Sequence, residues 1–403
     1  GATIAFTSAG LTGATSNTFN IPAPAPANDL CASPTALTIN GGNQSGTTVG
    51  ATYTSLTNEP FPAFSDVWYT FTPGSSGNIT ITTSTTGVDY DLYVYSTCPS
   101  SAISYVTGGD AANAGSTSET LTFSATSGTT YFIRVVNTTS TAGSTFTINA
   151  TMPLAPPTLT AAVGATVDAP FNVTFADDPT WRAAITSITV GGVTLTAGSA
   201  VSAGQITFTP SASTPTSLLQ SSGSKSIVVI ATGYTNATVT QAISAGTPTN
   251  LGITTQPTAP ATNGGSLAVQ PVVVIRDQYN NLTASTATVT AAVGAGTWTI
   301  GGTTSRDGVS GTATFSGLTA TSAAAVTGAT IVFTCAGLTD ITSNTFNIIA
   351  PPVAPTVTTP TSASIVNTTA TLGGNVTSNG GATITARGVV WSAEATNSNP
   401  TIG

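Results

Sequence analysis

The sequence contains no histidine and very few charged residues. Only 5% of its 403 residues are charged, with six lysines and arginines against fourteen aspartates and glutamates. Without histidine, the chain has no Ser-His-Asp or Cys-His nucleophile system and no histidine-ligated zinc site. Six dispersed positive charges form no basic patch for nucleic acid. We therefore expect a protein that is not an enzyme and does not bind nucleic acid.

Long apolar runs are absent and cysteines are few. No run approaches the roughly 20 apolar residues of a membrane-spanning helix, so we expect no membrane span in this segment. The single lysine, the single methionine and the missing histidine suit an extracellular protein, in which disulfides persist. Cys31 and Cys98 fall in one proposed domain, which predicts a disulfide, with two buried thiols as the alternative. Cys335 is expected to be a buried free thiol.

Strand-forming residues are abundant, whereas charged residues are few. Hydrophobic residues account for 40% of the chain. Residues 78–85, 287–293 and 312–318 alternate apolar with small or hydroxyl-bearing residues, as half-buried antiparallel strands do. Residues 131–137 and 226–234 are more continuously apolar and are predicted to be central strands. The sequence predicts an all-β chain of tandem β-sandwich domains, immunoglobulin-like or jelly-roll-like, joined by proline-rich linkers.

Proline-rich segments divide the chain, and their alternation of proline with alanine favours semi-rigid polyproline II spacers. They lie at residues 21–29, 152–157, 246–250 and 348–356. The segments between them predict sandwich domains at residues 27–151, 157–246 and 247–350, with partial domains at residues 1–22 and 354–403.

An internal repeat explains the first partial domain. Residues 1–20 read GATIAFTSAGLTGATSNTFN and residues 328–347 read GATIVFTCAGLTDITSNTFN, identical at sixteen of twenty positions. The second copy closes the predicted 247–350 domain. We therefore expect residues 1–22 to be the closing strands of a preceding domain of the same kind, in a longer chain. Ser8 stands where the second copy has Cys335, which favours the free thiol.

The 27–151 domain carries a specific order of segments, which includes SDVWYTFTP (65–73), GVDYDLYVYS (87–96) and GTTYFIRVVN (128–137). This order resembles the pre-peptidase C-terminal-like domains of secreted bacterial proteins, especially those of the Bacteroidota. The resemblance implies a small non-catalytic β-sandwich. Alternation places Val67 and Tyr69 on one face of a strand and Trp68 on the other. We expect these aromatic residues to be core residues, with a ligand platform as the alternative.

The other domains resemble further surface modules. Residues 157–246 resemble a bacterial surface domain that in some proteins is associated with haemoglobin or haem, but Tyr234 at a strand end is a poor candidate for an iron ligand. Residues 247–350 resemble the bacterial immunoglobulin-like repeats of invasin and intimin. There, we expect Asp277 and Asn280 to close a turn. Residues 354–403 resemble the start of a fibronectin-type-III-like repeat of Bacteroidota surface proteins.

One group of acids could bind a metal ion. Asp89 and Asp91 are two residues apart at the start of a predicted strand, so both carboxylates point to one side. Asp110 lies in a loop of the same domain. Calcium takes about six to eight oxygen ligands, which these carboxylates and backbone carbonyls could supply. Calcium is the one cofactor that the sequence indicates, and the alternative is that Asp89 and Asp91 cap turns and stay solvated.

These observations predict an extracellular, non-catalytic segment of a bacterial cell-surface protein. It would serve as an adhesive stalk or filament, contacting cell-surface, matrix or glycan ligands, or copies of itself in a fibre. Sandwiches that each have their own core suit this role, because stability is then local and the rod grows by repetition. The alternative is an accessory carbohydrate- or protein-binding region of a large secreted hydrolase.

Overall fold

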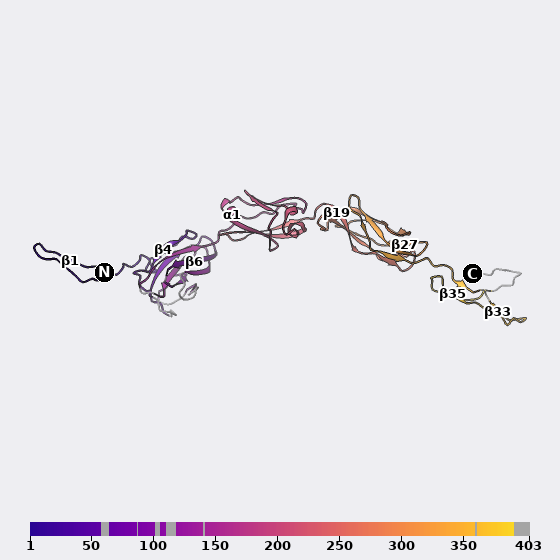
Figure 1. Ribbon diagram of the computed structural model, residues 1–403, viewed down its shortest axis with the longest axis horizontal. Helices are drawn as coiled ribbons and strands as arrows, with labels where there is room; N and C mark the ends of the chain where they lie inside the picture. Colours follow the sequence, from indigo (N-terminus) through magenta and orange to yellow (C-terminus); the bar gives the residue numbers. More distant parts are fainter. Residues whose placement is uncertain are drawn as a thin grey trace. The chain divides into compact units, whose positions relative to one another are not determined.

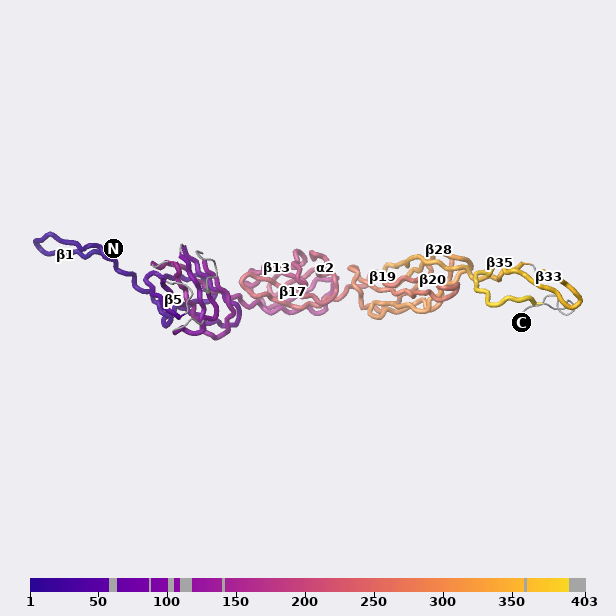
Figure 2. The backbone as a smooth tube through the Cα atoms, turned by 90° about the horizontal axis from the view of Figure 1, so that it is seen from below, coloured from indigo at the N-terminus to yellow at the C-terminus, as the bar shows by residue number. Residues whose placement is uncertain are grey.

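The computed structural model describes residues 1–57, 64–86, 88–100, 105–109, 118–139, 142–358 and 361–390. Strands dominate this part of the chain, which confirms the all-β prediction, and its helices are two short α-helices and one 3-10 turn. Figures 1 and 2 follow the successive sheets along the chain as the colour changes from indigo to yellow. Asp110 lies outside the described residues.

The first group of strands forms a two-sheet sandwich. The first sheet has the order β3-β5-β10-β7-β8 and the second the order β4-β11-β6-β9. Strand β3 runs parallel to β5, whereas the other neighbouring strands of these two sheets are antiparallel. The strands are β3 (Thr35–Ala36), β4 (Gln44–Thr47), β5 (Ser65–Phe71), β6 (Gly77–Thr85), β7 (Tyr90–Tyr95), β8 (Thr107–Gly109), β9 (Ser118–Ala125), β10 (Tyr131–Asn137) and β11 (Thr145–Thr151).

Strands β5, β10 and β7 of the first sheet are buried on both faces. Val67, Tyr69 and Phe71 belong to the large core between the two sheets. Trp68 and Tyr93 belong to a second apolar cluster, which also contains Cys31, Leu56, Tyr95 and Val136. The predicted alternation along these strands is confirmed, and Trp68 is fully buried. The aromatic residues on the second face are therefore core residues and form no exposed ligand platform.

The next strands form a three-stranded sheet, β12-β16-β15, and a four-stranded sheet, β14-β13-β17-β18. Two short helices, α1 (Pro179–Ala184) and α2 (Ser217–Gln220), lie among them and were not predicted. Trp181 of α1 is fully buried and packs edge-on against Phe175 at 5.0 Å between ring centroids. The strands are β12 (Phe171–Thr174), β13 (Ile185–Val190), β14 (Val193–Thr194), β15 (Ser199–Ser202), β16 (Gln205–Phe208), β17 (Gly223–Ala231) and β18 (Ala237–Ile243).

The last large group of strands surrounds one core, which includes Val273, Phe315 and Phe333. Its two larger sheets have the orders β19-β22-β26 and β25-β23-β29-β30. The strands are β19 (Pro248–Thr255), β20 (Thr258–Pro260), β21 (Leu267–Val269), β22 (Val272–Asp277), β23 (Thr288–Val293), β24 (Thr299–Gly301), β25 (Ser305–Asp307), β26 (Thr312–Thr314), β27 (Thr319–Thr321), β28 (Val326–Ala329), β29 (Ile331–Thr334), β30 (Ile341–Thr342) and β31 (Phe346–Ile348).

The proline-rich segment at 246–250 differs from the expected spacer. Strand β19 begins at Pro248, and the amide of Gly246 donates a hydrogen bond of 2.8 Å to the carboxylate of Asp277. Proline at the first position of a strand costs no ladder hydrogen bond, which is why a strand can start there. The segment is therefore hydrogen-bonded chain rather than a free polyproline spacer.

Short exposed strands occupy both ends of the described chain. A two-stranded hairpin, β1 (Ala5–Phe6) and β2 (Ala14–Thr15), precedes the first sandwich. Two further pairs follow the last large core, and their residues are mostly exposed. These pairs are β32 (Thr356–Val357) with β35 (Val376–Ser378), and β33 (Thr361–Ala363) with β34 (Thr371–Gly373).

Candidate functional site

Three charged side chains share the second face of the first sheet. Strand β10 lies between β5 and β7, and Val136 pairs with Asp66 on one side and with Asp91 on the other. Arg134, two residues away on the same strand, therefore points to the same face. Asp66, Arg134 and Asp91 are all at least 98% buried. Buried charges are costly unless they are paired, so their partners decide what this face can do.

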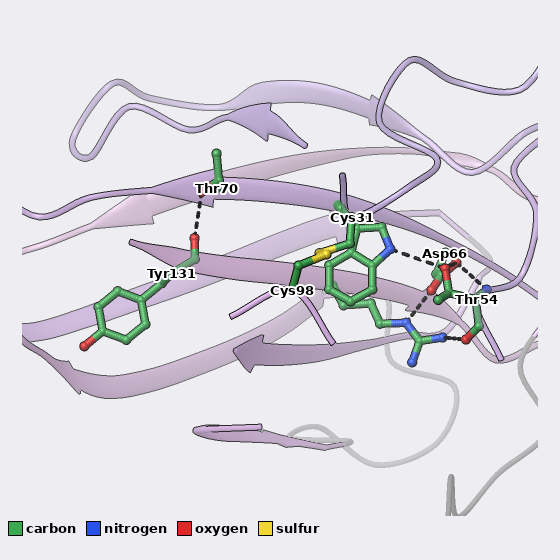
Figure 3. The surroundings of a disulfide bond; sticks show 8 residues. Cys31, Thr54, Asp66, Thr70, Cys98 and Tyr131 are labelled. Atoms are coloured by element: carbon green, nitrogen blue, oxygen red, sulfur yellow. Dashed lines mark hydrogen bonds and ion pairs between the residues drawn. A yellow bond between two sulfur atoms is a disulfide. The ribbon is translucent and has the colours of Figure 1, made fainter. Parts of the chain in front are cut away.

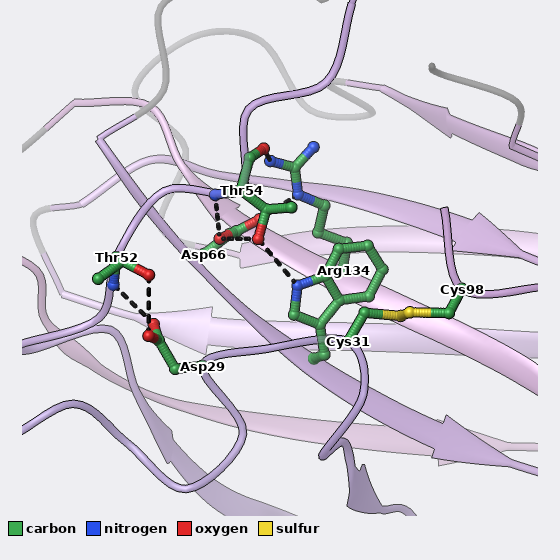
Figure 4. Close-up of polar contacts among 8 residues, drawn as sticks. Asp29, Cys31, Thr52, Thr54, Asp66, Cys98 and Arg134 are labelled. Atoms are coloured by element: carbon green, nitrogen blue, oxygen red, sulfur yellow. Dashed lines mark hydrogen bonds and ion pairs between the residues drawn. A yellow bond between two sulfur atoms is a disulfide. The ribbon is translucent and has the colours of Figure 1, made fainter. Parts of the chain in front are cut away.

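Arg134 is paired with Asp66 inside this face (Figures 3 and 4). Its Nε donates to Asp66 Oδ2, and its Nη2 donates to the carbonyl of Thr54. The amide and hydroxyl of Thr54 donate to Asp66 Oδ1 at 3.0 and 3.1 Å. The guanidinium also lies over the rings of Tyr53 and Trp68, with centroid distances of 5.5 and 5.6 Å. Ion pair, hydrogen bonds and aromatic faces together compensate for the lost hydration.

Burial dominates the electrostatics of this pair. Desolvation raises the pKa of the Asp66 carboxyl above its ordinary value, although Arg134 and the hydrogen bonds from Thr54 act in the opposite direction. The positive charge of Arg134 is thus paired with the Asp66 carboxylate inside the fold. We interpret this network as the element that holds the 52–56 segment onto the sheet.

The disulfide between Cys31 and Cys98 lies beside this network (Figure 3), as predicted from the sequence. The cysteines are 67 positions apart, and closing a loop of that length stabilises a fold by about 4 kcal/mol in the chain-entropy model. Cys335 is a buried free cysteine, and burial raises the pKa of its thiol.

Residues 28–31 are held in place by hydrogen bonds as well as by the Cys31–Cys98 disulfide. Asn28 and Trp68 exchange two hydrogen bonds, from the Asn28 side chain to the Trp68 carbonyl at 3.0 Å and from the Trp68 amide to the Asn28 carbonyl at 2.8 Å. The carboxylate of Asp29 accepts hydrogen bonds from the amide and hydroxyl of Thr52 at 2.6 and 2.8 Å (Figure 4). Residues 28–31 are therefore bonded to β5 through Asn28, to Thr52 through Asp29 and to Cys98 through Cys31.

Asp89 and Asp91 lie at the start of β7, but they are not solvated. Their exposed fractions are 5% and 2%, which contradicts the alternative that Asp89 and Asp91 cap turns and stay solvated. Asp91 Oδ2 accepts a hydrogen bond of 3.2 Å from the Tyr93 hydroxyl, and burial together with the Asp91 charge raises the pKa of Tyr93. Asp89 Oδ1 has no hydrogen-bond partner among the described residues.

A metal cluster is not visible in the part of the chain that the structure describes. No three histidine, cysteine, aspartate or glutamate side chains gather there. Because Asp110 lies outside that part, the predicted calcium site of Asp89, Asp91 and Asp110 stays a prediction.

A shallow groove of about 460 Å³ opens along the edge strand β4. Its walls carry hydroxyl and amide groups and no charged side chain. A second groove beside it shares Ser45, Gly46 and Thr145 and continues towards Ser84. Sequence reasoning missed this groove, because it depends on how two sheets meet. The first groove is lined by Pro26, Ala27, Asn28, Thr35, Ser45, Gly46, Thr47, Tyr69 and Thr145.

Two other candidate positions are structural. Tyr234 is half-buried at the turn after β17, and its amide donates to the carbonyl of Ala231. Asp277 does close a turn: its Oδ1 accepts hydrogen bonds from the amides of Tyr279 and Asn281. Asn280 contributes a left-handed backbone, with φ of 66°.

Two family models match parts of the chain. A galactose binding domain-like family, associated by its name with the type IX secretion system, matches residues 27–149. The Hb-interacting domain of the heme-binding protein Shr-like family matches residues 159–244. Both describe binding domains. Among curated proteins, none matches this chain.

Several solved structures are similar to segments of the chain. The pre-peptidase C-terminal domain of the collagenase from Bacillus anthracis is 18% identical, covering 32% of this chain and 99% of that one, with a TM-score of 0.21. The D00-D0 domain of intimin is 11% identical, covering 48% and 100%, with a TM-score of 0.30. Domains 4–9 of the surface layer protein SbsC are 13% identical, covering 68% and 41%, with a TM-score of 0.18.

Removing Arg134 should destabilise the first sandwich strongly. In an Arg134→Met variant, Asp66 would stay buried without its counter-ion, which costs about 3–5 kcal/mol. The matched control is Arg182→Met, since Arg182 and Asp177 form an ion pair in which both side chains are about one-third exposed. An exposed pair contributes about 0–1 kcal/mol. Hydrogen exchange of core amides in the full chain measures both losses.

The loss in Arg134→Met should depend on pH. Without Arg134, burial alone holds the pKa of Asp66 above its unfolded value of about 3.9. A carboxyl whose pKa is raised by folding destabilises the fold when ionised, so the loss is largest near neutral pH and shrinks as the pH falls. A loss of the same size at all pH values would contradict the buried-charge interpretation.

Proposed function

We propose that this chain is a structural and adhesive segment of a bacterial cell-surface protein, a stalk or filament without catalytic function. Its proposed units are the sandwiches at 27–151, 157–246 and 247–350, flanked by partial units at 1–22 and 354–403. One observation carries the proposal: the 27–151 unit and the 247–350 unit each have an apolar core of their own. Units with separate cores can unfold one at a time under load and leave the others intact.

The first sandwich has features that suit a load-bearing unit. Strand β10 pairs with β5 over seven consecutive residues and with β7 over six. The Cys31–Cys98 disulfide limits how far its chain can extend. Antiparallel pairing without register shifts lets many hydrogen bonds share a load.

The disulfide and the matching families support an extracellular position of the protein. A disulfide persists in oxidising surroundings outside the cytosol. The two matching families are a secretion-associated galactose binding domain-like family and a haemoglobin-interacting domain. Within the described residues, no helix has the length and apolarity to cross a membrane.

Glycan binding is the second candidate function, as an accessory activity of the 27–151 unit. The groove along β4 supports it, because hydroxyl and amide groups without net charge suit the hydroxyl groups of a neutral sugar. The match to a galactose binding domain-like family points to the same ligand class. In this role the chain would be a binding module of a larger secreted protein.

Calcium is the proposed metal of the same unit, near Asp89 and Asp91. The support is the unpartnered, buried Oδ1 of Asp89, two residues along the chain from the buried carboxylate of Asp91. A divalent cation would supply the missing partner of this oxygen and offset the two negative charges.

Single-molecule pulling tests the proposed function as a stalk of independently folded units. The full chain should unfold in separate steps, and a reductant should lengthen one step only. Releasing the 67 positions between the cysteines adds about 230 Å of chain at about 3.5 Å per residue. A Cys335→Ser variant is the control and should give unchanged step lengths. Unfolding of the whole chain in one step would contradict the proposal.

Titration with galactose-containing oligosaccharides tests the glycan candidate. A Ser45→Trp variant should abolish binding, because the indole would fill the groove along β4. A Thr120→Trp variant places the same side chain at an exposed position of β9, the far edge strand of that sheet, and should bind normally. Equal binding by both variants would place the sugar elsewhere.

Calcium should raise the melting temperature of the first sandwich, and EDTA should remove the increase. Asp91→Ala should abolish the calcium effect, whereas Asp340→Ala, at an exposed acid of the 247–350 unit, should leave it intact. A melting temperature unaffected by both calcium and EDTA would show that Asp89 and Asp91 bind no metal.

A further inference from the structure

The connector between the 157–246 and 247–350 sandwiches is three residues long. Ser244 still exchanges hydrogen bonds with the first of them, through the carbonyl of Ala165 and the amide of Val167. Strand β19 of the next sandwich begins at Pro248. Neighbouring domains ordinarily move against each other unless contacts prevent it, so the contacts around residues 245–247 decide how free this pair is. Most of both sandwiches falls in one compact unit, which comprises residues 158–182, 187–229 and 237–403.

Two carboxylates, one from each sandwich, bind consecutive amides of this connector. The amide of Gly246 donates to Asp277 Oδ2 at 2.8 Å, and the amide of Thr247 donates to Asp168 Oδ2 at 2.6 Å. The bonds cross, because the second sandwich holds the earlier residue and the first sandwich holds the later one. The bond from Thr247 lowers the pKa of the Asp168 carboxyl, so this group is ionised at neutral pH and its hydrogen bonds are charge-assisted.

Glycine at position 246 is what permits this arrangement. A Cβ atom there would overlap the Asp168 carboxylate. Any other residue would therefore push the carboxylate away from the amide of Thr247. The small residue thus has a specific role in the contact between connector and sandwich.

Further hydrogen bonds join the two sandwiches directly. Gln278 Nε2 donates to Asp168 Oδ1 at 3.0 Å. Asn281 Nδ2 donates to the carbonyl of Gln220 at 2.8 Å, and Asn281 Oδ1 accepts from the amide of Ser222 at 2.9 Å. The carboxamide of Asn281 therefore binds a backbone acceptor and a backbone donor after α2, as a neighbouring strand would.

The turn that carries these side chains is fixed by its own sandwich. Asp277 is fully buried, and its two oxygens accept hydrogen bonds from the amide and from the side chain of Asn281, at 2.9 and 2.8 Å. A side chain that is already oriented loses little freedom when it makes a further contact. The short connector also keeps the two surfaces at a high effective concentration. Both effects favour persistent contacts at this joint.

We propose that Asp168 and the 277–281 turn lock the 157–246 and 247–350 sandwiches into one rigid pair, whose mutual orientation is fixed in solution. This goes beyond the proposed stalk function, which requires only that each unit can fold by itself. A chain with free joints bends at every connector, whereas a locked pair transmits bending and torsion from one sandwich to the next.

Distances between two spin labels test the lock in the full chain. The labels are attached to an unnatural amino acid at Thr238 and at Thr314, which are exposed strand residues of the two sandwiches. This leaves the cysteines untouched. Pulsed electron paramagnetic resonance should give one narrow distance distribution for the intact chain.

An Asp168→Ala/Asn281→Ala double variant should make this distribution at least twice as wide. Asp277 is left in place, because it also closes its own turn. The matched control is Asn236→Ala/Asn347→Ala, which removes one exposed carboxamide from each sandwich at positions that do not bond across the connector. The control should keep the narrow distribution of the intact chain.

Gly246→Ala tests the same joint from the connector, since its Cβ would displace the Asp168 carboxylate. It should also widen the distribution, and it decides the test if the double variant loses hydrogen-exchange protection in either sandwich. An unchanged width in the folded variants would overturn the proposal. A broad distribution in the intact chain would overturn it as well, because the two sandwiches would then already move freely.

Discussion

Strands β5, β10 and β7 are buried on both faces, and most features of the first sandwich follow from this constraint. One face packs against the second sheet in the large core. The other face is covered by chain from the N-terminal segment, held there by the Cys31–Cys98 disulfide and by hydrogen bonds to Asn28 and Asp29. A charged side chain on this face has no access to water. Arg134 is therefore stable only with Asp66 and Thr54 beside it.

The strands of the 247–350 unit follow a different pattern of burial. Strand β29 alternates between buried and half-buried residues, as a sheet with one covered face does. Its core is closed by a local hairpin instead of a disulfide, and Cys335 remains a free thiol within that core. Stability here comes from the apolar contacts within that core.

Period-two alternation made the strands and their faces predictable, because burial of alternate residues leaves a direct trace in the sequence. The helix α1 was missed, although Asp178 accepts hydrogen bonds from the amides of Thr180 and Trp181 and Pro179 begins the helix. An aspartate followed by a proline is a helix-start signal, and here it lies within a chain whose other segments favour strands. The Arg134–Asp66 pair could not be predicted, since it depends on the pairing of strands that are distant in sequence.

Packing within the sandwiches of this chain depends on shape and strand register more than on charge. With 5% charged residues, the protein has little long-range electrostatic attraction with which to select a partner. One of its six basic residues, Arg134, is already paired inside the fold. In the closing hairpin of the 247–350 unit, the side chains of Ile331, Phe333 and Phe346 are buried in the core. A register shift of one residue would turn the side chains of such a strand away from that core.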